Sequence, residues 1–284
     1  MALTWVTRPG SNVPDDPELL KSIDSKQKEF STIDSMSDEE CCRVCGATGD
    51  LSLEHTPAKA AFNKTSFLAL SMRHPLEAFV QWQGRKVQGG SKDKTLCKTC
   101  NNNTGSWYNA EYVKFARKCA FHAKPENAGK SITLSLKAYP NRLIKQALTN
   151  ICSVSQPGLC KRHRTLKELI QQKEMVASIS PLKVGVFINV NNVGRSSGVT
   201  VFVDNNRKIA RLIAEFSFWP LGWILTFDDI SYPGILDVSE WTNIDNGEKR
   251  QLTLEMPCQW VAGPYPGDFR SPEQLAPGGS KSVK

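Results

Sequence analysis

The chain has 284 residues, 40% of them hydrophobic and 23% charged, which is the composition of an ordinary globular protein with room for about two domains. Its longest apolar stretch, residues 213–227, contains Glu215, Pro220 and Gly222 and falls short of the roughly 20 apolar residues that a membrane span needs. The first residues also lack the pattern of a secretion signal, so we expect a cytoplasmic protein that contacts no membrane.

The first part of the chain predicts an arm followed by a small domain. Residues 1–40 are expected to form an N-terminal arm and linker with one short helix, and residues 41–128 a domain that begins with turns and short strands. After Gly105, apolar side chains recur on one face of a predicted helix that ends before Pro125. This stripe consists of Tyr108, Tyr112, Phe115, Cys119 and His122.

The second part, residues 130–262, predicts a further domain with two or three helices and an antiparallel sheet. Helical spacing of apolar residues favours helices over 141–152 and 165–173. Beyond Pro181, short runs rich in Val, Ile, Phe and Trp alternate with turns and predict strands. The predicted strands cover residues 184–190, 199–203, 212–218, 223–227 and 252–254. A proline-rich tail, residues 263–284, is expected to be disordered, and the fold class is α+β.

Two Cys-x-x-Cys pairs predict a structural zinc site. Cys42 and Cys45 form the first pair, Cys97 and Cys100 the second. Four thiolates fill the tetrahedral shell of Zn²⁺ and leave no position open for chemistry, so the ion is expected to hold structure only. Cys41 is an alternative to Cys42 with less favourable spacing. A second, weaker zinc set would combine Cys-x-x-His pairs at residues 119–122 and 160–163.

Three polar residues lie close in sequence to the two Cys-x-x-Cys pairs, each of which we call a knuckle. Glu54 and His55 follow the first pair, and Asn101 directly follows Cys100. Because the zinc would tie the two pairs together, these side chains are expected to converge. An imidazole can take a proton from water, and oxygen ligands suit a hard divalent ion. This set is suited to the hydrolysis of a phosphodiester.

The succession Cys-x-x-Cys, Glu-His-x-Pro and Leu-Cys-x-x-Cys-Asn resembles the zinc-containing HNH endonucleases, which have a ββα-metal fold. The resemblance covers residues 42–109. It implies that His55 is the general base and that Glu54 and Asn101 bind a catalytic Mg²⁺ or Mn²⁺. The family more often has Asp at the position of Glu54. Its middle Asn, which braces the histidine loop, usually lies just before the second cysteine pair, where Asp93 is the candidate here.

The net charge of +8 is concentrated between residues 97 and 167, where 13 lysines and arginines face two acidic residues. Such a basic block favours a polyanionic partner, although charge runs are also common on solvated helix faces. The candidate nucleic-acid contacts are Lys114, Arg117, Lys118, Lys161, Arg162 and Arg164.

Together these features predict a DNA endonuclease with one catalytic divalent ion and one structural zinc. RNA is an alternative substrate, and a zinc-bearing nucleic-acid-binding protein without catalysis is the alternative function. A single ββα site cuts one strand, so a homodimer would suit double-strand cleavage. By family analogy, the chain would serve as the effector of a restriction or phage-defence system, controlled by a regulatory protein partner.

Overall fold

The computed structural model describes residues 16–34, 40–69, 85–204, 209–263 and 265–275. Its helices are α1 (Pro17–Asp34), α2 (Lys98–Ala120), α3 (Pro140–Val154), α4 (Gly158–Arg162), α5 (Arg164–Gln171) and α6 (Pro272–Leu275), with 3-10 turns η2 (Pro125–Asn127) and η3 (Ser239–Asn243). A helix-and-sheet architecture of the α+β class is therefore confirmed. Among the described helices, none combines the length and apolar character that crossing a bilayer requires.

A ββα unit stands at the N-terminal side of the fold. β1 (Leu51–His55) pairs antiparallel with β4 (Lys92–Cys97), and α2 follows β4 directly. The Cys97 thiol caps α2 by accepting a hydrogen bond from the Cys100 amide. This cap starts the helix at Lys98, earlier than the stripe after Gly105 predicts. A separate small ribbon joins β2 (Phe67–Ala69) and β3 (Arg85–Val87).

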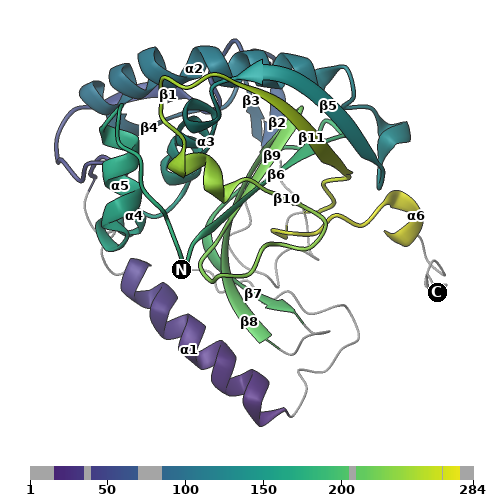
Figure 1. Cartoon of the computed structure of the whole chain (residues 1–284). Coiled ribbons are helices and arrows are strands. Elements are labelled where there is room, and N and C mark those ends of the chain that lie inside the picture. The colour runs from purple at the N-terminus through teal and green to yellow at the C-terminus, as the bar shows by residue number, and fades with distance from the viewer. Residues whose placement is uncertain (1–15, 35–39, 70–84, 205–208, 264, 276–284) are drawn as a thin grey trace.

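A seven-stranded sheet forms the other half of the molecule (Figure 1). Its strands run in the order β5, β11, β6, β9, β8, β7, with β10 beside β6. They are β5 (Ser131–Ala138), β6 (Lys183–Asn189), β7 (Arg195–Asp204), β8 (Ile209–Phe218), β9 (Leu221–Thr226), β10 (Leu236–Asp237) and β11 (Arg250–Gln259). The pairing is antiparallel except between β11 and β6, which run parallel, so the predicted all-antiparallel sheet is corrected at this one pair.

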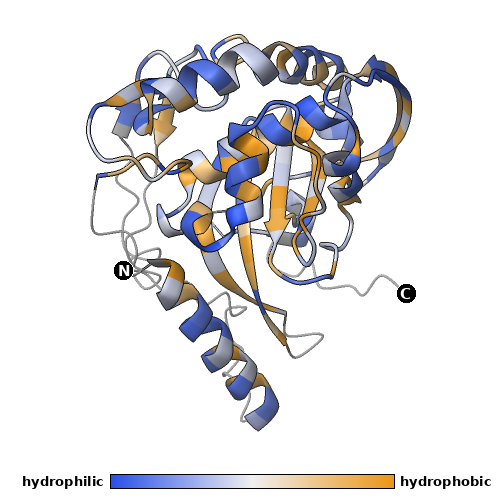
Figure 2. Cartoon of the chain, turned by 60° about the vertical axis from the view of Figure 1, so that its left-hand side comes forward, coloured by the Kyte–Doolittle hydropathy of each residue, from blue (hydrophilic) through white to orange (hydrophobic). Residues whose placement is uncertain are grey.

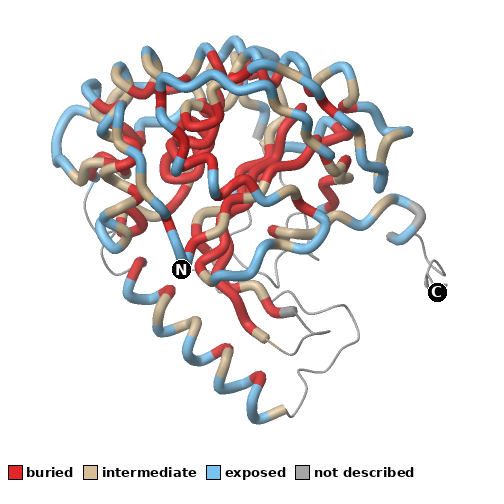
Figure 3. Tube along the Cα trace, viewed as in Figure 1, coloured by how far each residue is buried: buried red, intermediate tan, exposed pale blue. Residues whose placement is uncertain are grey.

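Helix α3 occupies the centre of the molecule, between α2 and the sheet (Figures 1 and 3). Thirteen of its 15 residues are buried. Its apolar side chains, including Leu143 and Leu148, belong to one hydrophobic cluster that also contains Cys42 and Tyr112. Hydrophobic residues concentrate on this helix and on the central strands in Figure 2. The cluster runs without interruption across residue 130, where the sequence predicts a domain boundary.

Both ends of the sequence differ in part from expectation. Helix α1 packs along β8 and β7, and the Ser22 hydroxyl accepts a hydrogen bond from the Ala210 amide. The sequence predicts disorder from residue 263. Instead, Phe269 packs against Phe187 with ring centroids 4.8 Å apart, because the buried Arg195 holds the Ala262 carbonyl at 2.7 Å. Residues 1–15 and 276–284 lie outside the described part of the chain.

Candidate metal centre and catalytic site

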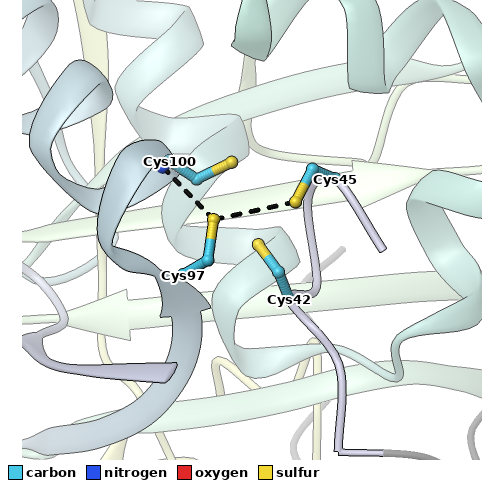
Figure 4. A group of neighbouring side chains, drawn as sticks. All are labelled: Cys42, Cys45, Cys97 and Cys100. Carbon is cyan, nitrogen blue, oxygen red and sulfur yellow. Dashed lines mark hydrogen bonds between the residues drawn. The ribbon is translucent and has the colours of Figure 1, made fainter. Parts of the chain in front are cut away.

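The four paired cysteines form a site that can hold a metal ion. The sulfur atoms of Cys42, Cys45, Cys97 and Cys100 all lie within 4.8 Å of one another, and they point toward a common centre in Figure 4. Cys45 Sγ and Cys97 Sγ are 3.7 Å apart. A tetrahedral zinc–thiolate centre with bonds of about 2.3 Å has sulfur–sulfur distances of about 3.8 Å. The donor set and its spacing therefore fit Zn²⁺.

The electrostatics of the cluster also favour a cation. The hydrogen bond from Cys100 lowers the pKa of Cys42, whereas the same bond raises the pKa of Cys100. Burial raises the pKa of Cys45 to about 11. Several thiolates so close together repel one another, and a bound cation removes this repulsion.

The alternative cysteine sets do not assemble in the described chain. Cys41 pairs with Thr48 in an isolated β-bridge and lies outside the four-sulfur cluster. Cys160 Sγ donates to Cys152 Sγ at 3.2 Å, and both side chains are buried in the core between α3 and α4. In the described part of the chain, the four-cysteine cluster is the only group of three or more Cys, His, Asp and Glu side chains placed closely enough to hold a metal ion, so the alternative second zinc set does not assemble.

His55 ends strand β1 and is partly exposed. Its Nε2 atom lies 3.1 Å from the Gly89 carbonyl oxygen. A carbonyl accepts hydrogen bonds but cannot donate them, so Nε2 carries a proton and the neutral form of the ring has its lone pair on Nδ1. The backbone of the following residue, Thr56, is held by the Ser91 carbonyl at 3.2 Å. The imidazole is therefore fixed in one tautomer at the end of the hairpin.

Glu54 is buried, with 6% of its surface exposed. Ser153 Oγ donates to its Oε1 atom at 2.7 Å, and Thr95 Oγ1 is hydrogen-bonded to the same atom and lies 2.7 Å from Ser153 Oγ. A bulge in β4 leaves Thr95 without a partner on β1 and turns it toward Glu54. Burial raises the pKa of Glu54 to about 7, and the two hydroxyl donors oppose that rise.

Asn101 stands in the first turn of α2 and reaches back to β1. Its Nδ2 group donates to Ser52 Oγ at 3.0 Å, and Ser52 Oγ donates to the Leu96 carbonyl at 3.0 Å. Since the one hydroxyl proton of Ser52 is used on Leu96, Asn101 must present its amide nitrogen to Ser52. The amide oxygen Oδ1 is left for another partner. Ser52 and Glu54 lie two residues apart and point to the same face of β1.

The predicted site residues thus meet around one hairpin, although no hydrogen bond in the described chain directly joins Glu54, His55 and Asn101 to one another. The sequence missed a bracing residue, Asn63. It is fully buried, and its Nδ2 group donates to the carbonyls of Pro57 and Ser91 at 2.7 and 2.8 Å. Its Oδ1 atom accepts from the Ser91 amide at 2.6 Å.

Asn63 therefore holds the loop after His55 against the loop before β4. The candidate for this brace, Asp93, is instead exposed and accepts only from the Lys94 amide in the described chain. The signal that could have found Asn63 is an asparagine next to the apolar pair Ala61-Phe62, eight residues after His55.

The predicted nucleic-acid contacts lie on three helices. Lys114, Arg117 and Lys118 are exposed on α2, where Lys114 pairs with Glu111 at 3.2 Å. Lys161 and Arg162 are exposed on α4, and Arg164 begins α5 and pairs with Glu168 at 2.6 Å.

Lys161 lies beside the first knuckle, since a β-carbon on Gly46 would stand 3.7 Å from its Cε. By contrast, Lys145 belongs to the basic block but is fully buried. Its ammonium donates to the carbonyls of Gln172, Lys173 and Met175 at 2.8–3.0 Å. Lys145 therefore stabilises the segment that follows α5, and its buried ammonium cannot contact a phosphate.

Comparison with protein-family models, curated proteins and solved structures gave no match to this chain.

Proposed function

We propose that this chain is a divalent-metal-dependent endonuclease of the HNH type, built around a structural zinc ion. The observation that carries the proposal is the hydrogen bond between His55 Nε2 and the Gly89 carbonyl. It uses Nε2 as the donor, so the neutral form of the ring carries its lone pair on Nδ1 at the end of β1, in a β1–β4–α2 unit that contains the four clustered cysteines. An imidazole held in this way is suited to act as a general base.

In the proposed reaction, His55 Nδ1 removes a proton from a water molecule as the water oxygen attacks phosphorus. The bond from phosphorus to the 3′ oxygen breaks, and that oxygen takes up a proton from solvent while the imidazolium releases one. Glu54 and Asn101 would hold Mg²⁺ or Mn²⁺, which stabilises the charge on the leaving oxygen. Asn63 keeps the His55 loop in place.

The exposed cations support a nucleic acid as the substrate. The basic residues of α2 begin at Lys114, which at 1.5 Å per residue stands about 20 Å along the helix from Asn101. On α4, Lys161 lies beside the first cysteine pair, and Arg162 is exposed next to it in the chain. A phosphodiester backbone that entered the site would meet cations on both elements. We propose DNA as the substrate.

A zinc-bearing nucleic-acid-binding protein without catalysis is the second candidate. The observation that favours it is the burial of Glu54, whose Oε1 atom is already occupied by two hydroxyl groups. In that case Glu54 would be a structural residue joining the hairpin to α3, and the zinc and the basic helices would serve binding alone.

Nicking of supercoiled plasmid separates the two candidates. Wild-type protein should nick DNA with Mg²⁺ or Mn²⁺ and stop in EDTA, and His55→Ala should lower the rate by about 10²–10⁴-fold. His122→Ala is the matched control, because His122 is also partly buried but lies in the turn just beyond the C-terminal end of α2. It should nick like the wild type.

Zinc content and a gel-shift assay should be measured on every variant, since removal of a general base leaves folding and binding intact. Wild-type protein that shifts DNA but never nicks it would support the binding protein instead. A His55→Ala variant as active as wild type would place the base elsewhere.

A further inference from the structure

We propose that Ser153, in the last turn of α3, is a positioning residue for Glu54. The chain beyond residue 130 would then supply part of the metal site. This inference rests on the proposed function, because it takes Glu54 to be a ligand of the catalytic ion.

The hydroxyl of Ser153 is committed to Glu54 by the hydrogen-bond pattern around it. Ser153 is 4% exposed, and its Oγ atom donates to Glu54 Oε1 at 2.7 Å. A serine hydroxyl has one proton and two acceptor sites. With that proton on Glu54, Ser153 Oγ is the acceptor in its two other contacts, at 2.7 Å from Thr95 Oγ1 and 3.2 Å from Thr56 Oγ1. Ser153 therefore links both threonine hydroxyls to Glu54.

The hydroxyl contacts of Glu54 fall on one oxygen of its carboxylate. Thr95 Oγ1 also contacts Oε1, but its single proton serves both that contact and the one with Ser153 Oγ. Oε2 accepts no hydrogen bond in the described chain, and it is not among the described polar atoms that are both fully buried and without a partner. Thr95 and Ser153 therefore hold Oε1 and leave Oε2 as the atom that can face a cation. Such outer partners orient a ligand and tune its affinity.

A second contact docks the same end of α3 on the ββα unit. Arg43, between the first two clustered cysteines, donates to the Ser155 carbonyl. Separately, Phe62 packs edge-on against Trp219, in the turn between β8 and β9, with ring centroids 4.8 Å apart. The ββα unit is therefore held against both α3 and the sheet, which fixes the position of Ser153 relative to Glu54.

Ser153→Ala should weaken binding of the catalytic ion about 10–100-fold, the usual effect of losing an outer partner of a metal ligand. Ser155→Ala is the matched control. Ser155 is equally buried and lies two residues away, but its hydroxyl bonds only to the Ile151 carbonyl of its own helix. Ser153→Cys, which keeps the volume roughly but donates weakly, should be intermediate and provides a second variant if Ser153→Ala does not fold.

The experiment combines two readouts on zinc-loaded, full-length protein. Mn²⁺ binding without DNA is measured by the loss of the free Mn²⁺ signal in electron paramagnetic resonance. Plasmid nicking is then followed against Mn²⁺ concentration. We expect Ser153→Ala to raise the half-saturating Mn²⁺ concentration in both assays and to regain a near wild-type rate at saturation. Ser155→Ala should behave like the wild type.

The outcomes distinguish the inference from the proposed function. If wild-type protein nicks through His55 but Ser153→Ala binds Mn²⁺ as tightly as Ser155→Ala does, the inference is overturned and the nuclease remains. If no variant nicks, yet Ser153→Ala weakens a Mn²⁺ site that Glu54→Gln abolishes, the inference holds and the nuclease does not. Absence of Mn²⁺ binding by the wild-type protein, or loss of affinity in Ser153→Ala and Ser155→Ala alike, also overturns the inference.

Discussion

A β-carbon on residue 90 would lie 2.3 Å from the Asn63 carbonyl oxygen and 2.5 Å from its side-chain oxygen. Gly90 also has a φ of +90°, a region that side chains disfavour. Asn63 can hold the His55 loop in place only because residue 90, which packs directly against it, is a glycine.

Gly90→Ala should destabilise the protein more than Gly129→Ala. Both glycines have positive φ, at +90° and +74°, but a β-carbon on Gly129 meets nothing within 4 Å. Each substitution should cost about 1–2 kcal/mol for the left-handed backbone. Gly90→Ala should cost about 1–3 kcal/mol more, because the crowded Asn63 has to move. Urea unfolding measures both, and equal losses would show that the brace tolerates displacement.

Cys97→Ser should remove the structural zinc. Elemental analysis of protein purified without added metal should give about one zinc per wild-type chain and much less for the variant, which should be poorly soluble. Cys41→Ser is the control, because Cys41 is buried next to Cys42 but lies outside the sulfur cluster. A zinc-free Cys97→Ser variant with the wild-type unfolding transition would contradict a stabilising role of the ion.

Ligand and base should differ in their response to metal. Glu54→Ala and Asn101→Ala each remove one oxygen ligand, so lost nicking should return in part at higher Mn²⁺. His55→Ala removes the proton acceptor, so added metal should not restore its nicking activity. Nicking rates over a Mn²⁺ series make the comparison. Losses that respond equally to Mn²⁺ at all three positions would leave these roles without support.

Arg117 and Lys118 should contribute to DNA affinity through phosphate contacts. Replacing both by Ala should weaken binding to unrelated sequences to a similar degree. The slope of log affinity against log salt should become shallower by about 0.9 for each phosphate that is no longer neutralised. The control is Lys21→Ala with Lys28→Ala on α1, an equally exposed pair on a helix remote from α2 (Figure 1). Equal slopes for the two double variants would show that Arg117 and Lys118 face solvent and do not contact phosphates.

Arg162→Ala should change the same slope more than Arg164→Ala does. Arg164 is held by Glu168 at 2.6 Å, and an arginine that already has a carboxylate partner gives up that partner when it turns to a phosphate. Filter-binding measurements of DNA affinity across a salt series give the slope for each single variant. A larger effect at Arg164 would show that its pair opens on binding.

Local spacing was sufficient to predict several features of this protein. Two residues between paired cysteines place both sulfurs on one side of a turn, and the four sulfurs do cluster. The apolar stripe from Tyr108 to Cys119 predicts α2, because helical periodicity depends only on neighbours three and four residues away. Runs of β-branched and aromatic residues predict β6, β7, β8 and β9 for the same local reason.

Strand β5 is absent from the predicted strands, although its residues alternate strictly between exposed Ser, Thr and Lys and inward apolar side chains. Such alternation is the local signal of a half-buried strand, so β5 could have been predicted from its own segment. Lys145 shows a real limit, because only the packing of α3 and α5 buries its ammonium against three carbonyls.

At the candidate site, the sequence by itself determined the candidate residues: the four cysteines as ligands of a structural ion, and Glu54, His55 and Asn101 as the proposed catalytic set. Only the tertiary structure decided what holds them. Ser153 is 99 residues from Glu54 in the chain, and no local pattern marks it among the polar residues of α3. It reaches Glu54 because the buried apolar side of α3 packs between α2 and the sheet. Contacts of this kind follow from how the hydrophobic core closes, and that depends on the whole chain.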